Sequence, residues 1–283
     1  MQHNNSNSIK TITSIPATRN QIKAVFFDID GTLVSFKTHR IPDSTTASIK
    51  RLQEKGIKVF VATGRSIHAL AHIRHLDFDG FVTFNGSCCV DKDGKMLFRK
   101  TIDPESIRGL LHYTSTHPLN FVLMYENGIA VNEVTPEIVS MQGKLNLPVP
   151  PLIDRSNADV SNVMQANIFL GPEEEAEFMR TVMPDCVATR WTPLFADVNP
   201  LHISKKVGVE LFCQHFGIDV SETMSFGDGG NDIEMLKHTA IGVAMGSAGN
   251  NVKAIADYVT DDPEHDGILK ALEYFGVLET ETE

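Results

Sequence analysis

The chain has 283 residues, of which 42% are hydrophobic and 22% are charged, as is ordinary for a globular enzyme of one large or two modest domains. Its formal net charge of −11 argues against nucleic-acid binding by bulk electrostatic attraction. An anionic ligand must therefore be attracted by local cations and backbone N–H groups. No apolar stretch is long enough to span a membrane. Residues 1–22 are polar, which predicts a flexible N-terminal extension and no signal peptide.

The four cysteines, Cys88, Cys89, Cys186 and Cys213, contain no Cys-x-x-Cys pair. The adjacent Cys88 and Cys89 cannot easily form a disulfide with each other. We therefore expect buried free thiols in a reducing compartment. Together with the absence of a membrane span and a signal peptide, this pattern predicts a cytoplasmic protein.

The segment 23–86 alternates short apolar strands with helices. The first expected helix has Asp43 or Ser44 as its N-cap, and Gly56 marks its end. A strand, a helix and a second strand in this order form a βαβ unit, which is expected to be parallel and right-handed. In chain order we expect a strand at 24–27, a helix at 43–55, a strand at 57–62, a helix at 66–75 and a strand at 80–84.

The pattern changes after Gly86 and returns near residue 200. Asp93-Gly94 and Asn127-Gly128 are hairpin signals between short apolar runs. The expected elements of this middle segment are two helices, near 104–117 and 172–182, and strands near 121–125 and 162–170. The alternation of helix and strand then resumes with a helix at 204–216, a strand at 224–226, a helix at 229–238 and a strand at 240–244.

The sequence therefore predicts an α/β fold with an inserted module. Residues 23–86 and 200–283 form a core with a Rossmann-like parallel sheet and helices on both faces. Residues 87–199 form a separate α+β module, since antiparallel strands and two helices are typical of that class.

The most informative motif is the run Asp28-Ile-Asp30-Gly31-Thr-Leu33, directly after the strand at 24–27. An apolar strand that ends in carboxylates delivers them to the carboxyl edge of a parallel sheet, where ligands of open α/β folds bind. One carboxylate can attack while the other transfers protons, and the pair can hold a hard cation. An EF-hand is excluded, because the glycine stands fourth instead of sixth and a strand leads into the motif.

Two further motifs supply phosphate-binding groups. Thr63 and Gly64 end the second strand before a helix, where a hydroxyl and free backbone N–H groups form a phosphate cradle. The ammonium of Lys205, at a helix start, can neutralise Asp28 and the oxygens of a transferring phosphoryl group. Taken alone, Lys205 is more simply interpreted as a solvated surface lysine.

The last motif is the run Gly227-Asp228-Gly-Gly-Asn231-Asp232, which follows a strand and opens a helix. Asp228 and Asp232 are expected one turn apart on one helix face. Acidic groups there suit a metal ion, and the nearby helix N-terminus relieves the repulsion between them.

Taken together, the four motifs resemble those of the haloacid dehalogenase (HAD) superfamily. The first motif matches Asp-x-Asp-Gly-Thr-Leu, the last matches Gly-Asp-Gly-x-Asn-Asp, and the similarity extends over nearly the whole chain from about residue 22. Many relatives have Lys-Gly at the third motif, where this chain has Lys205-Lys206. An insertion between the second and third motifs resembles the Cof-like, type IIB arrangement, in which the inserted α+β module is a cap.

The resemblance implies a Mg²⁺-dependent phosphatase that hydrolyses small phosphate monoesters, with sugar phosphates as the expected class. It implies that Asp28 attacks phosphorus to form an aspartyl-phosphate, while Asp30 protonates the leaving alcohol and then activates water. Lys205 is the expected catalytic cation. The other expected contacts are phosphate binding by Thr63, Gly64, Lys205 and Asn231, metal binding by Asp28, Asp30, Asp228 and Asp232, and substrate contacts by Asn85, Arg190 and Trp191.

Two other functions stay open. A phosphosugar mutase of the same cap class needs cations that hold a second phosphate, for which Arg180 and Arg190 are the nearby residues. A non-catalytic phosphometabolite sensor is opposed by the intact carboxylates of Asp28 and Asp30. The expected partner is a small phosphorylated metabolite, with no nucleic acid and no membrane, and the sequence leaves the oligomeric state open.

Overall fold

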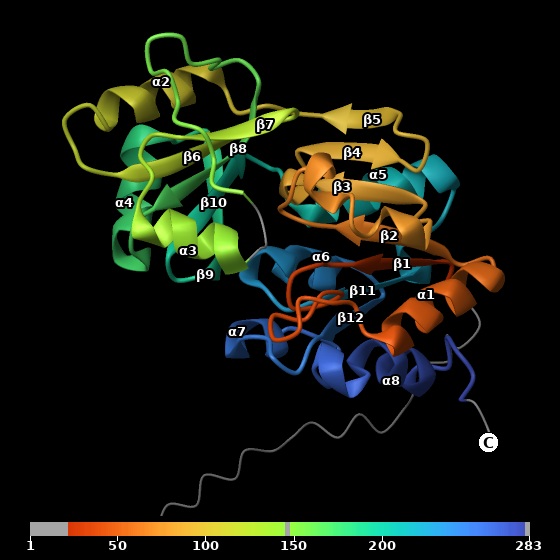
Figure 1. Cartoon of the computed structure of the whole chain (residues 1–283). Coiled ribbons are helices and arrows are strands. Elements are labelled where there is room, and N and C mark those ends of the chain that lie inside the picture. Colours follow the sequence, from red (N-terminus) through yellow and green to blue (C-terminus); the bar gives the residue numbers. More distant parts are fainter. Residues whose placement is uncertain (1–21, 145–147, 281–283) are drawn as a thin grey trace, which may run out of the picture.

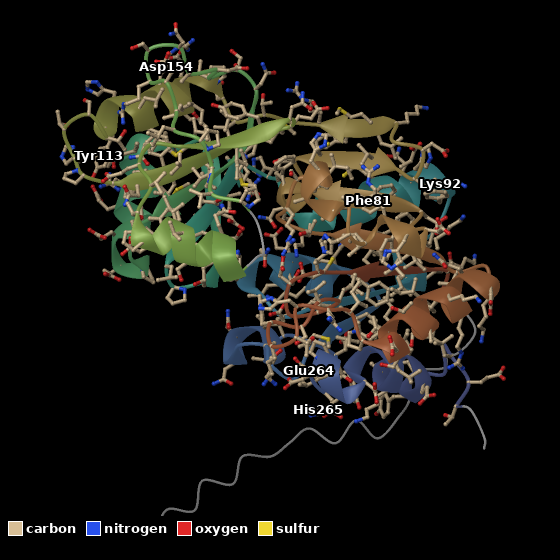
Figure 2. The ribbon with its side chains drawn as sticks, in the orientation of Figure 1. Phe81, Lys92, Tyr113, Asp154, Glu264 and His265 are labelled. Atoms are coloured by element: carbon tan, nitrogen blue, oxygen red, sulfur yellow. The ribbon has the colours of Figure 1, made fainter. Side chains whose placement is uncertain are left out.

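The computed structural model describes residues 22–144 and 148–280, and it has two β-sheets, each with its own helices (Figure 1). The expected N-terminal extension lies outside the described residues, except for Ile22. Side chains at the outer ends of the two parts are labelled in Figure 2. Tyr113 and Asp154 lie in the part with the second sheet, and Glu264 and His265 lie beside helix α8 (Gly267–Tyr274) of the other part.

The first sheet has eight strands. Their spatial order is β13 (Tyr258–Val259), β12 (Ile241–Ala244), β11 (Thr223–Gly227), β1 (Ala24–Phe27), β2 (Lys58–Ala62), β3 (Gly80–Thr83), β4 (Cys88–Asp91) and β5 (Met96–Arg99). The strands from β13 to β3 are all parallel. β4 and β5 extend this sheet in antiparallel fashion. The central parallel sheet confirms the expected α/β class.

Helices cover both faces of this sheet, as expected. The helices are α1 (Asp43–Glu54) and α8 on one face, α5 (Lys205–Phe216) and α6 (Ile233–His238) on the other, and the short α7 (Asn250–Lys253). Val25 and Phe27 of β1 pack in the cluster with α1 and α8. Ala24 and Phe26 pack in the cluster with α5 and α6. Strand β1 is therefore buried on both faces, which explains its uninterrupted apolar sequence.

The second sheet has five antiparallel strands. Their order is β7 (Gly128–Val131), β6 (Asn120–Tyr125), β8 (Val163–Phe169), β10 (Phe195–Pro200) and β9 (Cys186–Thr192). One face packs against α2 (Pro104–Tyr113) and α4 (Pro172–Val182). A third helix, α3 (Pro136–Lys144), packs through Ile138 on Val122 and Val131 of the opposite face. The sequence predicted only the first two of these helices.

The boundary between the two parts of the chain lies later than residue 87, where the sequence places it. β4 and β5 pair with β3 and with each other, so they belong to the core sheet and not to the inserted module. An antiparallel hairpin can extend a parallel sheet at its edge, which the sequence pattern did not reveal. The second sheet is built from residues 120–200, and this supports a module that begins near Ile102.

The expected helix at 66–75 is replaced by two short 3₁₀ turns, η1 (Ile67–Leu70) and η2 (Arg74–Leu76). Leu70, Ile73 and Leu76 are buried and stand three residues apart. Hydrogen bonds from Ile73 N to Leu70 O and from Leu76 N to Ile73 O, each 3.1 Å, close these turns. A spacing of three matches the 3₁₀ repeat, so these turns bury all three side chains on one side.

The state of the cysteines agrees with the expectation from the sequence. Cys88, Cys89, Cys186 and Cys213 are all buried free thiols. Within residues 22–144 and 148–280, no helix has the length and apolarity that crossing a membrane requires.

Candidate active site

The predicted site residues follow neighbouring strands of the first sheet. Asp28 follows β1, Thr63 follows β2, Asn85 lies just beyond β3, and Asp228 follows β11. These strands are parallel, so their carboxyl ends meet at one edge of the sheet. The face of the second sheet that does not contact α2 and α4 lies over this edge, and a cavity of about 290 Å³ separates the two.

Lys205 is the buried cation of the site. Its Nζ donates to Asp28 Oδ1 at 2.5 Å and to Asp232 Oδ1 at 2.6 Å, and its side chain is 0% exposed. Burial lowers the pKa of Lys205, but the charges of Asp232 and Asp28 outweigh this effect and raise it above the ordinary value. Lys206, one position along α5, is 41% exposed and pairs with Glu210 at 3.5 Å. The helix therefore turns one lysine into the site and the other to solvent.

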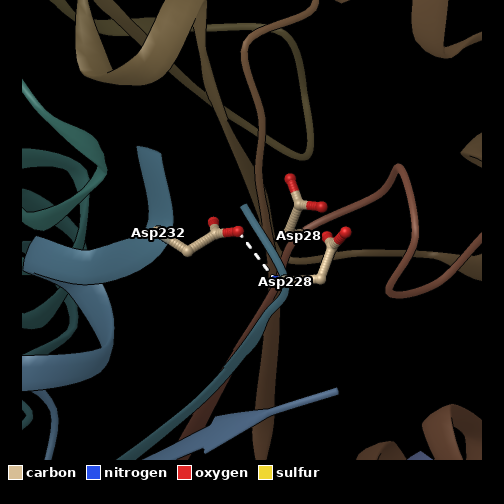
Figure 3. A group of neighbouring side chains, drawn as sticks. All are labelled: Asp28, Asp228 and Asp232. Atoms are coloured by element: carbon tan, nitrogen blue, oxygen red, sulfur yellow. Dashed lines mark hydrogen bonds between the residues drawn. The ribbon is translucent and has the colours of Figure 1, made fainter. Parts of the chain in front are cut away.

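Three acidic side chains, Asp28, Asp228 and Asp232, each place one carboxylate oxygen within 4.8 Å of the others (Figure 3). Asp232 also accepts hydrogen bonds from the backbone N–H groups of Asp228, at 3.0 Å, and of Gly229, at 2.9 Å. Gly31 has a φ of 88°, and a Cβ there would collide with the carboxylate of Asp228. The glycine of the first motif thus lets the first and last motifs approach each other.

The negative charges of these three carboxylates lie close together. Burial raises the pKa of Asp28 to about 7, with Lys205 lowering it and the charges of Asp232 and Asp30 adding to the rise. Burial, followed by the charges of Asp28 and Asp232, raises the pKa of Asp228 well above its ordinary value. Lys205 offsets only part of the repulsion among these carboxylates, and such a set of acidic oxygens fits a hard divalent cation such as Mg²⁺.

Asp30 lies apart from these three acids. Its carboxylate is held by a fork of two hydrogen bonds from Arg65, with Nε to Oδ2 at 2.7 Å and Nη2 to Oδ1 at 2.6 Å. The structure thus directs the Asp30 side chain to Arg65. The expected metal ligand of Asp30 is its backbone carbonyl and not this carboxylate. We did not predict Arg65 as a site residue, although a cation two positions after Thr63 was a usable signal.

Three of the four expected phosphate-binding residues line the cavity, and the fourth, Lys205, is buried behind Asp28. Thr63 Oγ1 accepts a hydrogen bond from the backbone N–H of Arg65 at 3.1 Å. Asn231 Nδ2 donates to Asn85 Oδ1 at 3.0 Å. Thr63, Gly64 and Asn231 are all on the cavity wall, beside Asp28 and Asp30.

The three expected substrate contacts have different positions. Trp191 lines the cavity and packs edge-on against Phe195, with ring centroids 5.4 Å apart. Asn85 is buried at the junction of the two sheets, where it bonds other protein groups. The side chain of Arg190 lies away from the cavity.

The guanidinium of Arg190 is bound within the second part of the chain. It donates to Glu175, to Leu170 O at 2.9 Å and to Pro193 O at 3.1 Å. Arg190 does not line the cavity, unlike the adjacent Trp191. Successive residues of a strand face opposite sides, so only one of this pair can face the site.

A network of polar side chains that the sequence did not reveal joins the two sheets. Asn85 Nδ2 donates to Gln165 Oε1 at 3.1 Å and to Asp197 Oδ2 at 3.0 Å. Asn167 Nδ2 donates to Asp197 Oδ1 at 2.5 Å. Asn199 Nδ2 donates to Gln165 Oε1 at 3.2 Å. These buried contacts connect the edge of the first sheet to the polar residues of β8 and β10.

A model of the haloacid dehalogenase-like hydrolases matches residues 25–272. The protein YkrA of Bacillus subtilis (strain 168) is 31% identical over 258 residues, which cover 90% of this chain and 98% of YkrA. The 5-amino-6-(5-phospho-D-ribitylamino)uracil phosphatase YcsE of the same strain is 28% identical over 256 residues, with 90% and 96% covered. The structure of the HAD subclass IIB sugar phosphatase BT4131 has a TM-score of 0.84 at 41% identity, covering 90% of this chain and 100% of BT4131.

The buried carboxylate of Asp197 predicts a dependence of stability on pH. Burial raises the pKa of Asp197 to about 6 from 3.8, although Asn85, Lys205 and Asn167 favour the ionised form. The folded state therefore binds a proton that the unfolded state has released, and stability falls as the pH rises from about 4 to about 6.

Asp197→Asn removes this titration. The free energy of unfolding of the variant, relative to that of the wild type, should therefore rise by roughly 2 kcal/mol from pH 4 to pH 7. Urea unfolding of both proteins at the two pH values measures this difference. A difference between the proteins that does not change with pH would contradict the prediction.

Proposed function

Since this chain belongs to the haloacid dehalogenase-like hydrolases and is a phosphoric monoester hydrolase, we propose that it cleaves small phosphate monoesters through an aspartyl-phosphate on Asp28. One observation carries the proposal. Asp28 lies at the cavity, held by the buried ammonium of Lys205 on one side and close to the carboxylate of Asp228 on the other. This is the arrangement of an oriented carboxylate nucleophile beside positive charge.

In the first half of the reaction, an oxygen of Asp28 attacks phosphorus in line with the ester bond. The new O–P bond forms as the bond from phosphorus to the leaving alcohol breaks. Lys205 binds Oδ1 of Asp28, which leaves Oδ2 as the oxygen that attacks. The same ammonium orients the carboxylate and offsets the charge that gathers around the phosphoryl group.

Asp30 is the group that moves protons. We propose that it gives a proton to the departing alcohol and then takes one from the water that attacks the aspartyl-phosphate. Both of its oxygens are bound by Arg65, so Arg65 must release one of them while Asp30 carries the proton. Arg65 is then a positioning residue that aims Asp30 at the leaving oxygen.

The phosphoryl oxygens are bound by Thr63, Gly64, Asn231 and Lys205 in this proposal. A side chain at Gly64 would have its Cβ 3.3 Å from the amide of Asn85 and 3.4 Å from the carboxylate of Asp197. Gly64 therefore leaves the backbone of this turn open to a phosphate oxygen.

The residues that would hold Mg²⁺ are Asp28 and Asp228, together with the backbone carbonyl of Asp30. When bound, the cation supplies positive charge that polarises the phosphoryl group and relieves the repulsion among the acids. Asp232 keeps its oxygens on Lys205 and on the turn at Asp228, so it orients these two groups.

Sugar phosphates are the proposed substrate class. The cavity is near the lower end of the roughly 300–1,000 Å³ typical of ligand pockets, which suits a small leaving group. Similarity to the sugar phosphatase BT4131 favours the same class.

We propose that the part built on the second sheet is the cap, which covers the cavity and selects the leaving group. The core and the cap would then divide near residues 100 and 200.

The arrangement of the side chains supports neither a phosphosugar mutase nor a non-catalytic sensor. A mutase requires cations for a second phosphate, but Arg190 is bound to Glu175 and Arg180 pairs with Glu177, outside the cavity. A sensor without turnover would not need Asp28 and Asp30 at the cavity beside a buried lysine.

Removal of divalent metal tests the proposed function directly. EDTA should stop phosphate release from p-nitrophenyl phosphate and from sugar phosphates. Mg²⁺ should restore activity better than Ca²⁺, because Ca²⁺ takes more ligands at longer distances. Asp228→Asn should raise the Mg²⁺ concentration that gives half-maximal activity, whereas the exposed Asp43→Asn should not. Full activity in metal-free buffer would refute the requirement for a metal.

The two adjacent lysines provide a matched pair for the role of the cation. Lys205→Met keeps the length of the buried stem but removes its charge, and it should lower kcat roughly 10²- to 10³-fold. Lys206→Met should change kcat less than about twofold, because its charge is exposed at the surface. Thermal unfolding establishes that both variants are folded. Equal losses, or a larger loss for Lys206→Met, would show that the catalytic lysine is misassigned.

A further inference from the structure

The cap side of the cavity is largely apolar. It is formed by Val122, Met124, Ile129, Trp191 and Phe195, which lie across from Asp28 and Asp30. These side chains suit the carbon atoms of a leaving group but not its hydroxyl groups. Any hydroxyl buried there needs a polar partner, because an unpaired one is costly to remove from water.

One polar side chain on the cap is available as such a partner. Among the described residues, six have a buried side-chain polar atom without a hydrogen bond, and they are Ser44, Thr45, Thr135, Gln142, Thr189 and His238. Of these six residues, only Gln142 lines the cavity, and its unpaired atom is Oε1. Gln142 is 3% exposed. A buried amide oxygen without a partner destabilises the empty protein and calls for a functional reason.

Helix α3 fixes this amide above the cavity. Ile138 is fully buried against Val122 and Val131 of the second sheet. Gln142 follows Ile138 by four residues, so both lie on the same side of the helix. The packing of Ile138 therefore carries Gln142 to the wall of the cavity and holds it there.

The other buried polar side chains on the cap side of the cavity are already hydrogen-bonded within the protein. Gln165 Oε1 accepts from Asn85 and from Asn199. Both oxygens of Asp197 accept hydrogen bonds, from Asn85 and from Asn167. The two bonds from Asn85 hold the cap on the core, and recruiting their acceptors for a ligand would break that junction. Gln142 Oε1 accepts no hydrogen bond from any of the described residues.

We infer that Gln142 is a specificity-determining residue, which accepts a hydrogen bond from a hydroxyl group of the leaving alcohol. The inference rests on the proposed phosphatase function. It narrows the substrates to phosphate monoesters of small polyhydroxy alcohols, with carbon–hydrogen faces that pack on Trp191 and Phe195 and one hydroxyl that pairs with Gln142. A leaving group without a donor, such as p-nitrophenol, gains nothing from this amide.

The test compares, within each variant, phosphate esters of polyhydroxy alcohols with an ester whose leaving group lacks a hydrogen-bond donor. Gln142→Met keeps the shape of the side chain and removes the amide, and Gln142→Leu is a second variant of the same kind. The probes are glucose 6-phosphate, ribose 5-phosphate and glycerol 3-phosphate, with p-nitrophenyl phosphate as the probe that lacks a donor. Ser140→Ala, on an exposed position of α3, is the matched control.

For the polyhydroxy substrate that the wild type prefers, Gln142→Met should raise KM about 3- to 10-fold and change kcat less than about twofold. Both constants for p-nitrophenyl phosphate should stay within about twofold. The midpoint of thermal unfolding should be equal or higher, because the variant no longer buries an unpaired amide oxygen. Ser140→Ala should leave all of these values unchanged.

Equal changes for both kinds of substrate, or none, would overturn the role of Gln142. Turnover of p-nitrophenyl phosphate without turnover of any polyhydroxy ester would overturn the substrate class. Both outcomes leave the proposed phosphatase intact. Failure of the wild type to release phosphate from every probe in Mg²⁺ would instead overturn the proposed function, and this inference with it.

Discussion

The buried ammonium of Lys205 is the interaction on which the rest of the site depends. It joins Asp28, after β1, to Asp232, before α6, so it links segments about 200 residues apart. Removing charges from water is costly, and the cluster is tolerated because one cation faces two carboxylates at hydrogen-bonding distance. Without Lys205 the two acids would repel each other in a buried place. The same contact that holds the two halves of the core together thus orients the proposed nucleophile.

The second constraint is the junction between the two sheets, that is, between the core and the proposed cap. Asn85 adopts a positive φ of 52° just beyond β3, and its amide bonds Asn231 on the core side and Gln165 and Asp197 on the cap side. The cap sheet presents apolar residues to α2 and α4 and polar ones to this junction. One sheet can do both because successive side chains of a strand face opposite sides. The polar face thereby fixes the cap over the carboxyl edge of the core strands.

The sequence predicted which residues meet at the carboxyl edge of the core sheet, because each of them is marked by a short local motif. Asp28, Thr63 and Asp228 each follow a recognisable strand, and parallel strands bring their ends together. Arg190 does not line the cavity, and the sequence already contained the reason, because Trp191 is adjacent to it and successive residues of a strand face opposite sides. The polar network on β8 and β10 left only a faint period-two signal inside apolar strands. Which strands pair, and where the hairpin of β4 and β5 attaches, depends on contacts between segments far apart in the chain.

The central claim is that Asp28 takes up the phosphoryl group. Rapid acid quench during turnover of p-nitrophenyl phosphate with Mg²⁺, followed by peptide mass spectrometry, tests it most directly. We expect a phosphoryl group on the peptide containing Asp28 in the wild type. We expect neither this adduct nor turnover in Asp28→Asn, which keeps the shape of the side chain. Normal turnover by Asp28→Asn, or a phosphoryl group on another residue, would contradict the role of Asp28 as the nucleophile.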